Sequence, residues 1–329
     1  MKELIENFPK QLLEGLIIGE EIKFDTGNFE AETVLICGMG GSGIGGNLIL
    51  DLLQRVSKKP IVISKNYSIP EFVNENTLAI FCSYSGNTEE TISALNEGIE
   101  KNCKIVCVTS GGDMGRISVE NKIPCYWIPG GMPPRACLGY SMTQIYFILN
   151  HFNIVSDNFK NEILNSASLL GSEIESIQKE AWNIAEFLFE KKIIIYSTEL
   201  NQSVATRFKQ QLNENSKVHA HCETIPEMNH NELVAWRKFD DKIAVLFLRD
   251  SSEHPRNSLR IKLNEVEIEK CTPNIKHVYA KGDSPLIKTF YLIHLLDWVS
   301  FYLAELNNVD PSEINVLNYL KNCLSVKSS

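Results

Sequence analysis

Short apolar runs alternate with longer stretches in which apolar residues recur every three to four positions. A run of about five apolar residues is typical of a buried strand, and the longer periodic stretches are typical of helices. In the first half, the pattern predicts strands at 33–37, 60–63, 78–82, 104–108 and 125–128, and helices at about 43–56, 88–101 and 135–151. After a helical stretch near 158–190, it predicts strands at 192–197, 243–249 and 276–280, and helices near 202–213, 255–267 and 286–307.

This alternation indicates βαβ units and parallel sheets. We therefore expect an α/β fold with two domains of similar design, each a parallel sheet flanked by helices. The boundary falls near residue 153, which gives domains at 1–153 and 154–329.

The net charge and the cysteine content limit the partners and the cellular compartment that this chain fits. The net charge of −9 argues against nucleic acid or an anionic membrane as a partner. The nine cysteines are scattered, odd in number and without a CxxC pair, which predicts buried thiols in a reducing cytoplasm. The first residues do not form a signal peptide, and the apolar stretch 286–306 contains Lys288 and Asp297, so it is a poor membrane span.

Two turns after predicted strands are suited to an anion. Gly38-Met39-Gly40-Gly41-Ser42-Gly43 follows the strand at 33–37 and matches G-x-G-x-x-G. A dinucleotide site would need an acidic residue after the second strand, but Ser64-Lys65 stand there. We expect an anion site in this turn rather than a nucleotide site, although the glycines could also serve strand–helix packing.

The second turn, Ser83-Tyr84-Ser85-Gly86-Asn87-Thr88, brings three hydroxyls to the start of one helix. Unpaired N–H groups at a helix N-terminus bind phosphate or carboxylate. Helix capping by Ser85 or Thr88 is the alternative, but capping needs only one hydroxyl. The two turns together predict a phosphorylated small molecule at the edge of the sheet.

Other polar segments leave alternatives open. Arg135 follows Pro133-Pro134 in the first turn of a predicted helix, where a cation opposes the helix dipole, so a ligand-facing role is favoured over a solvated surface position. The segment 213–217 has the composition of an ordinary helix end. His219 and His221 are more typical of strand residues than of a metal site. His230 is equally compatible with an acid–base role and with a surface loop.

Six segments together resemble the bifunctional phosphoglucose/phosphomannose isomerase family, whose fold is built from sugar isomerase (SIS) domains. They occur in the family's order and span nearly the whole chain: GMGGSGIGG at 38–46, SYSGNTEET at 83–91, PPRACLG at 133–139, NENSK at 213–217, PEMNHNE at 226–232 and DPSEINVLNYLK at 310–321. The resemblance implies two SIS domains, a homodimer, and aldose–ketose isomerisation of a sugar phosphate without metal or nucleotide cofactor.

The resemblance also implies roles for particular residues. Ser83, Ser85 and Thr88 would hold the phosphate, with Gly41 and Ser42 close by. In the chemistry, Glu214 would be the base that moves a proton between C1 and C2, Arg135 would stabilise the enediolate, His230 would assist ring opening from the partner subunit, and Lys321 would complete the site. A carboxylate and a guanidinium in one water-poor site suit this reaction, because the base needs a stabilised oxyanion beside it.

Three alternatives remain at this point. The isomerase part of a glucosamine-6-phosphate synthase would usually follow a glutaminase domain with an N-terminal cysteine, which this chain lacks. A non-catalytic SIS sensor of sugar phosphates would need neither Glu214 nor Arg135. A zinc-dependent cupin isomerase would be mainly β.

Overall fold

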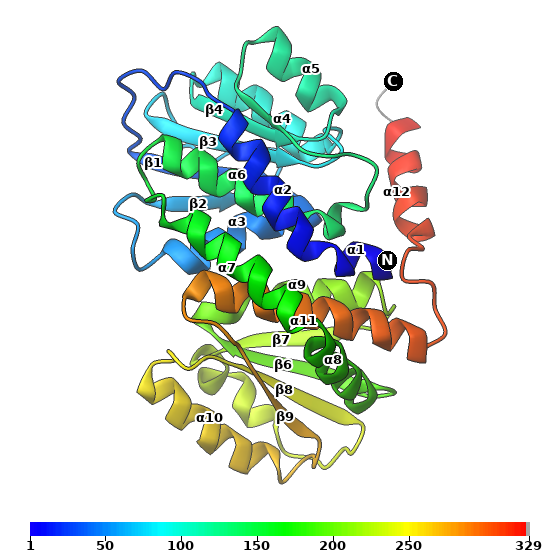
Figure 1. Cartoon of the computed structure of the whole chain (residues 1–329). Helices are drawn as coiled ribbons and strands as arrows, with labels where there is room; N and C mark the ends of the chain where they lie inside the picture. The colour runs from blue at the N-terminus through cyan, green and yellow to red at the C-terminus, as the bar shows by residue number, and fades with distance from the viewer. Residues whose placement is uncertain (327–329) are drawn as a thin grey trace.

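The computed structural model describes residues 1–326 and contains two parallel sheets with helices on both faces of each (Figure 1). The predicted α/β fold of two helix-flanked parallel sheets is confirmed. The division into residues 1–153 and 154–329 stays a prediction.

The first sheet has the strand order β2-β1-β3-β4-β5. Its strands are β1 (Thr33–Gly38), β2 (Ile61–Ser64), β3 (Thr77–Ser83), β4 (Lys104–Thr109) and β5 (Cys125–Trp127). The central strands β1, β3 and β4 are almost wholly buried, as their unbroken apolar runs require of strands covered on both faces.

The second sheet repeats this arrangement with the order β7-β6-β8-β9. Its strands are β6 (Lys192–Thr198), β7 (Ala220–Ile225), β8 (Ile243–Arg249) and β9 (Ile275–Tyr279). The predictions lacked β7, because this edge strand mixes His221, Glu223 and Thr224 with small residues and is only partly buried.

Helices fill the space between the two sheets and cover both outer faces (Figure 1). The outer face of the first sheet packs against α4 (Glu89–Glu100) and α5 (Gly112–Glu120), and that of the second against α10 (Pro255–Ile268). Between the sheets lie α2 (Phe8–Glu21), α3 (Gly40–Leu53), α6 (Leu138–His151), α7 (Asn158–Ser172), α8 (Ile174–Leu188), α9 (Gln202–Glu214) and α11 (Pro285–Leu306).

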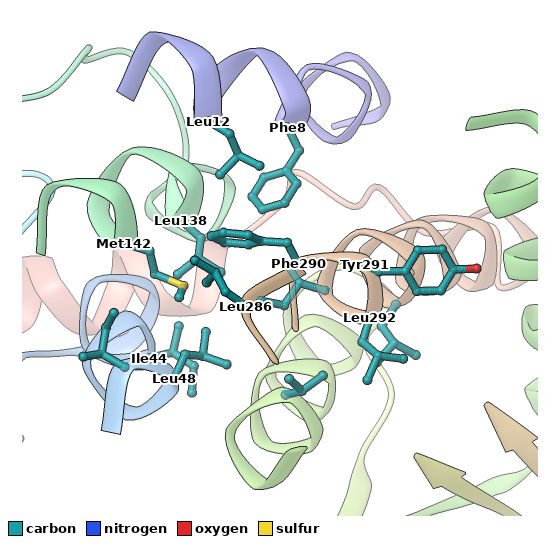
Figure 2. Close-up of a cluster of buried hydrophobic side chains, with 14 of the residues drawn as sticks. Phe8, Leu12, Ile44, Leu48, Leu138, Met142, Leu286, Phe290, Tyr291 and Leu292 are labelled. Atoms are coloured by element: carbon teal, nitrogen blue, oxygen red, sulfur yellow. The ribbon is translucent and has the colours of Figure 1, made fainter. Parts of the chain in front are cut away.

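The core between the sheets is continuous. Figure 2 shows side chains from α2, α3, α6 and α11 converging there. The rings of Phe8 and Phe290 meet edge to face, with centroids 5.8 Å apart. Rigid packing of this layer fixes the relative positions of the strand ends that bear the polar motifs.

The helix α11 is long and apolar enough to cross a membrane, but 94% of the apolar window is buried inside the protein. Its buried Lys288 and Asp297 are paired: Lys288 Nζ lies 2.8 Å from Asp250 Oδ1, and Asp297 Oδ2 accepts a hydrogen bond from Arg207 at 2.6 Å. It is therefore a central core helix of this fold.

Several helices differ from the predictions. The region near 158–190 forms two helices, α7 and α8, and α6 begins at Leu138 because Pro134–Ala136 form a separate 3-10 turn, η1. The helices α1 (Lys2–Glu6), α2, α5 and the largely exposed α12 (Asn315–Val326) were not predicted. The helix α1 is only five residues long, and α5 contains Gly112 and Gly115.

Candidate active site

The two anion-type turns lie side by side at the carboxyl edge of the first sheet. Strands β1 and β3 are direct parallel neighbours, and Gly38 at the end of β1 pairs with Cys82 near the end of β3. The chain runs from β1 to β2 on one side and from β3 to β4 on the other, and the ends of β1 and β3 therefore flank the crevice where ligands bind in open α/β sheets. The expected adjacency of the two turns is confirmed, and their role as an anion site stays a prediction.

The hydroxyls of the SYSGNT turn bond to one another and to the turn, and none of them caps the following helix. Ser83 Oγ and Thr88 Oγ1 are 2.9 Å apart, and Ser85 Oγ accepts a hydrogen bond from the Asn87 N–H at 3.2 Å. Thr88 is the N-cap residue of α4, yet its side chain makes no capping bond there. The capping alternative is therefore wrong, and the first N–H groups of α4 stay available to a ligand.

Glycine is required at Gly86 by both backbone angle and space. Its φ is +69°, and a β-carbon there would lie 1.7 Å from the Gly111 carbonyl oxygen. Asn87 Oδ1 in turn accepts the Asp113 N–H at the start of α5. The turn between β4 and α5 thus holds the SYSGNT turn in place, through this hydrogen bond and the close approach of Gly111.

The glycine-rich turn links the SYSGNT turn to Arg135. Ser42 Oγ accepts the Tyr84 N–H at 3.0 Å, which ties the start of α3 to the end of β3. A β-carbon on Gly41 would lie 2.8 Å from the Arg135 backbone nitrogen, so only glycine lets η1 approach so closely. Gly41 and Ser42 therefore lie beside both the hydroxyl turn and the arginine.

Arg135 is 3% exposed, and all sides of its guanidinium are engaged. Nε donates to Asn215 Oδ1 at 2.8 Å, Nη1 to Glu214 Oε2 at 3.1 Å and Nη2 to the Pro311 carbonyl at 2.7 Å. The predicted position in the first turn of a helix is wrong, because Arg135 belongs to η1, and a solvated surface position is also excluded. Burial lowers the pKa of Arg135, while the charge of Glu214 opposes that shift.

Glu214 is the last residue of α9, and its side chain is 32% exposed. Its carboxylate contacts the guanidinium of Arg135 on one side and remains accessible on the other. The sequence separates the two residues by 79 positions. The structure thus joins a carboxylate and a buried cation beside the two turns, which is the pairing that proton abstraction next to a carbonyl needs.

Two residues of the NENSK segment were missed as parts of this site. Asn215 is fully buried, accepts from Arg135 and donates to Ser300 Oγ at 2.9 Å. Lys217 donates to three backbone carbonyls, and burial lowers its pKa. Only their place beside Glu214 in the motif could have pointed to them, because their partners lie far away in the sequence.

Within the described part of one chain, His230 and Lys321 do not join the pair formed by Glu214 and Arg135. His230 ends the short 3-10 helix η3 (Glu227–His230), and Lys321 lies on α12; both are exposed. Among the described residues, neither side chain makes a hydrogen bond or ion pair with Glu214 or Arg135.

The histidines of β7 have a different environment. His219 is exposed, and His221 Nε2 lies 2.8 Å from Glu232 Oε2 in the 3-10 helix η4 (Glu232–Ala235). Residues 1–326 contain no cluster of three or more His, Cys, Asp or Glu side chains arranged to hold a metal ion.

Comparison with known proteins identifies the family. The chain is 32% identical over 335 residues to a bifunctional phosphoglucose/phosphomannose isomerase of Caldicellulosiruptor bescii, with 99% of each chain covered. It is 36% identical to the protein of the same name in Thermoplasma acidophilum, over 93% of this chain and 94% of that one. The chain belongs to the bifunctional phosphoglucose/phosphomannose isomerase family.

Two further comparisons agree with this family. A model of the bacterial phospho-glucose isomerase C-terminal SIS domain matches residues 177–324. The C-terminal domain of glucosamine-fructose-6-phosphate aminotransferase from Francisella tularensis has the same fold, with a TM-score of 0.78 at 17% identity over 94% of this chain and 96% of that one. The motifs of this chain therefore lie on an SIS architecture.

Proposed function

We propose that this protein interconverts glucose 6-phosphate, and mannose 6-phosphate, with fructose 6-phosphate through a cis-enediolate. The observation that supports it best is the contact between Glu214 and Arg135, 3.1 Å between Nη1 and Oε2, beside the SYSGNT turn. We infer the substrates from the names of the relatives. The paired carboxylate and guanidinium provide the base and the oxyanion stabilisation that isomerisation of these substrates needs.

The substrate phosphate binds at the N-terminus of α4. The hydroxyls of Ser83, Ser85 and Thr88 and the free N–H groups of the helix surround it, and Gly41 and Ser42 complete the wall. The positive end of the helix dipole favours the phosphate charge. The sugar then extends from the phosphate toward Glu214 and Arg135.

Glu214 removes the proton from C2 of the open-chain aldose, and the electron pair moves to form the C1–C2 double bond. The charge that develops on the C1 oxygen is stabilised by the Arg135 guanidinium, whose three hydrogen bonds hold it in place before the reaction. The C1 oxygen then takes up a proton and the C2 hydroxyl gives one up, so that the C2 carbonyl forms as Glu214 returns its proton to C1, which yields the ketose. Return to either face of C2 in the reverse direction yields glucose or mannose 6-phosphate.

His230 and Lys321 complete the site in a homodimer, with His230 supplied by the partner subunit for ring opening. Their exposure in one chain is consistent with this arrangement. Large apolar side chains near His230 are exposed as well, with Val234 at 70% and Phe239 at 62%. Such neighbours of an exposed polar residue are typical of a surface that another chain covers.

We also assign residues 1–153 and 154–329 to the two SIS domains and the enzyme to the cytoplasm. All nine cysteines are free thiols, which suits a reducing compartment. The non-catalytic sensor receives no support from the relatives, which are named as isomerases.

The test is an assay on fructose 6-phosphate that detects glucose and mannose 6-phosphate separately, with and without a chelator. We expect both products, in amounts unaffected by the chelator. Phosphate binding without turnover would favour the sensor instead. Loss of turnover in EDTA that zinc restores would show that a metal takes part.

A further inference from the structure

Lys217 joins two parts of the chain that are distant in sequence. Its ammonium donates to the carbonyl oxygens of Glu214 at 2.6 Å, Asp310 at 2.9 Å and Glu313 at 2.9 Å. An ammonium group has three donors, so these three carbonyls occupy all of them. One acceptor belongs to the residue that bears the candidate base, and the other two belong to the segment that leads into α12.

Two neighbouring contacts hold the same segment. Asn307 Nδ2 donates to the Ser216 carbonyl at 3.1 Å, and Arg135 Nη2 donates to the Pro311 carbonyl at 2.7 Å. We call residues 307–326 the C-terminal strap: it follows α11 and ends with α12, on the outer side of the molecule (Figure 1). Residues 307–313 of the strap are therefore held near the end of α9 through backbone carbonyls, and Lys217 makes more of these bonds than Asn307 or Arg135.

The backbone at Lys217 adopts a left-handed conformation, which glycine would adopt without strain. Its φ is +58°, just past the end of α9. Glycine or asparagine is the usual residue in this left-handed conformation, because a β-carbon destabilises it. The three hydrogen bonds of the ammonium offset that strain.

We infer that Lys217 is a positioning residue, which fixes the C-terminal strap to the end of α9 and thereby sets the position of Glu214 and of Lys321 on α12. For its effect on catalysis the inference rests on the proposed function. The contact to Glu214 is through its backbone carbonyl, so Lys217 acts on the geometry of the site and not on the reacting atoms.

The test compares Lys217→Gly with Lys122→Gly. Lys122 is also an exposed lysine just past a helix end, with φ +55°, and its ammonium has no hydrogen-bonding partner among residues 1–326. Glycine relieves the backbone strain at both positions, so both variants should fold with a Tm near that of the wild type. Only Lys217→Gly removes the bonds to the strap.

The first readout is amide hydrogen exchange, which does not depend on activity. We expect peptides covering residues 310–324 to exchange at least about tenfold faster in Lys217→Gly, with the two sheets unchanged. Lys122→Gly should leave the strap at the wild-type rate. Unchanged protection of the strap in Lys217→Gly would overturn the inference.

The second readout is the steady-state kinetics of isomerisation. Because misplacement of a base by less than an ångström slows a reaction strongly, we expect kcat to fall about tenfold or more in Lys217→Gly, with a smaller change in KM. Lys217→Arg, which keeps a cation able to donate to carbonyls, should recover part of the loss. If the strap exchanges faster in Lys217→Gly but kcat stays at the wild-type value, the positioning role is refuted. If the wild-type protein shows no turnover, the proposed function is refuted. In that case the exchange measurement alone decides whether Lys217 holds the strap.

Discussion

At the residue scale, the candidate site depends on a buried arginine whose position no local pattern reveals. Arg135 follows two prolines, and its partners Glu214, Asn215 and Pro311 lie 79 or more positions away. Hydrophobic periodicity predicts elements but not which distant side chains meet. The pairing of Arg135 with Glu214 was therefore accessible only through the family resemblance, and the part played by Asn215 only through its place beside Glu214 in the motif.

The role of Glu214 is tested by Glu214→Gln, which keeps the size and the hydrogen bond to Arg135 but removes the base. We expect kcat to fall by about 10³-fold, since general-base catalysis contributes roughly 10² to 10⁴. Binding of fructose 6-phosphate, measured by calorimetry, should stay nearly unchanged. The exposed Glu186 on α8 offers a control, Glu186→Gln, that should keep wild-type turnover. Near-normal kcat in Glu214→Gln would mean that another group is the base.

At the element scale, most strands could be predicted from the sequence, but the polar ends of the helices could be predicted only in part. The apolar runs identified eight of the nine strands found in residues 1–326, because buried parallel strands need continuous apolar residues. The edge strand β7 was missed because it mixes polar and apolar residues and is only partly buried. The exposed helix α12 was missed although its apolar residues recur at helical spacing. The start of α4 was recognised as an anion-type turn, but its lack of a side-chain cap is visible only in the structure.

The uncapped start of α4 predicts the kinetic effect of Ser85→Ala. Ser85 is exposed and bonds only within the turn, whereas Thr88 is bonded to the buried Ser83, so Ser85 is the cleaner position to change. We expect KM to rise about tenfold with little change in kcat, because a phosphate contact is equal in the ground and transition states. The exposed Ser168 on α7 supplies a control, Ser168→Ala. An effect on kcat alone would speak against a phosphate at this turn.

A partly buried carboxylate between α3 and α9 predicts how stability depends on pH. Asp51 on α3 accepts the Ser203 N–H in the first turn of α9, at 2.7 Å, and burial raises its pKa to about 6. Between pH 4 and 6 the folded protein keeps a proton that the unfolded chain releases, so this residue lowers the free energy of unfolding as pH rises through that range.

Asp51→Asn removes that ionisation and keeps an oxygen that can accept the Ser203 N–H. We expect it to raise the free energy of unfolding by about 1–2 kcal/mol at pH 7, with the gain shrinking toward zero near pH 4. Urea unfolding at both pH values measures this, with the exposed Asp241→Asn as control. A destabilised variant at pH 7 would show that the charged carboxylate stabilises the start of α9.

At the scale of the whole molecule, the fold was predictable and the complete site was not. Alternating strands and helices predict an α/β fold with parallel sheets, whereas the strand order is visible only in the structure. Of the predicted site residues, however, the described residues 1–326 of one chain bring together the two anion-type turns, Arg135 and Glu214. His230 and Lys321 stay exposed outside this group. No pattern in one sequence shows which surface a second copy covers, so the assembly has to be tested directly.

Mixing two inactive variants tests whether His230 acts across a homodimer. In a mixed dimer of Glu214→Gln and His230→Ala, one site combines the intact Glu214 of one subunit with the intact His230 of the other, and the second site lacks both. With random exchange, half of the dimers are mixed, so about a quarter of the wild-type activity should return. Exchange is verified by native mass spectrometry of subunits that differ in mass, and each variant incubated alone is the control. If mixed dimers form and no activity returns, His230 either acts within its own chain or takes no part in catalysis.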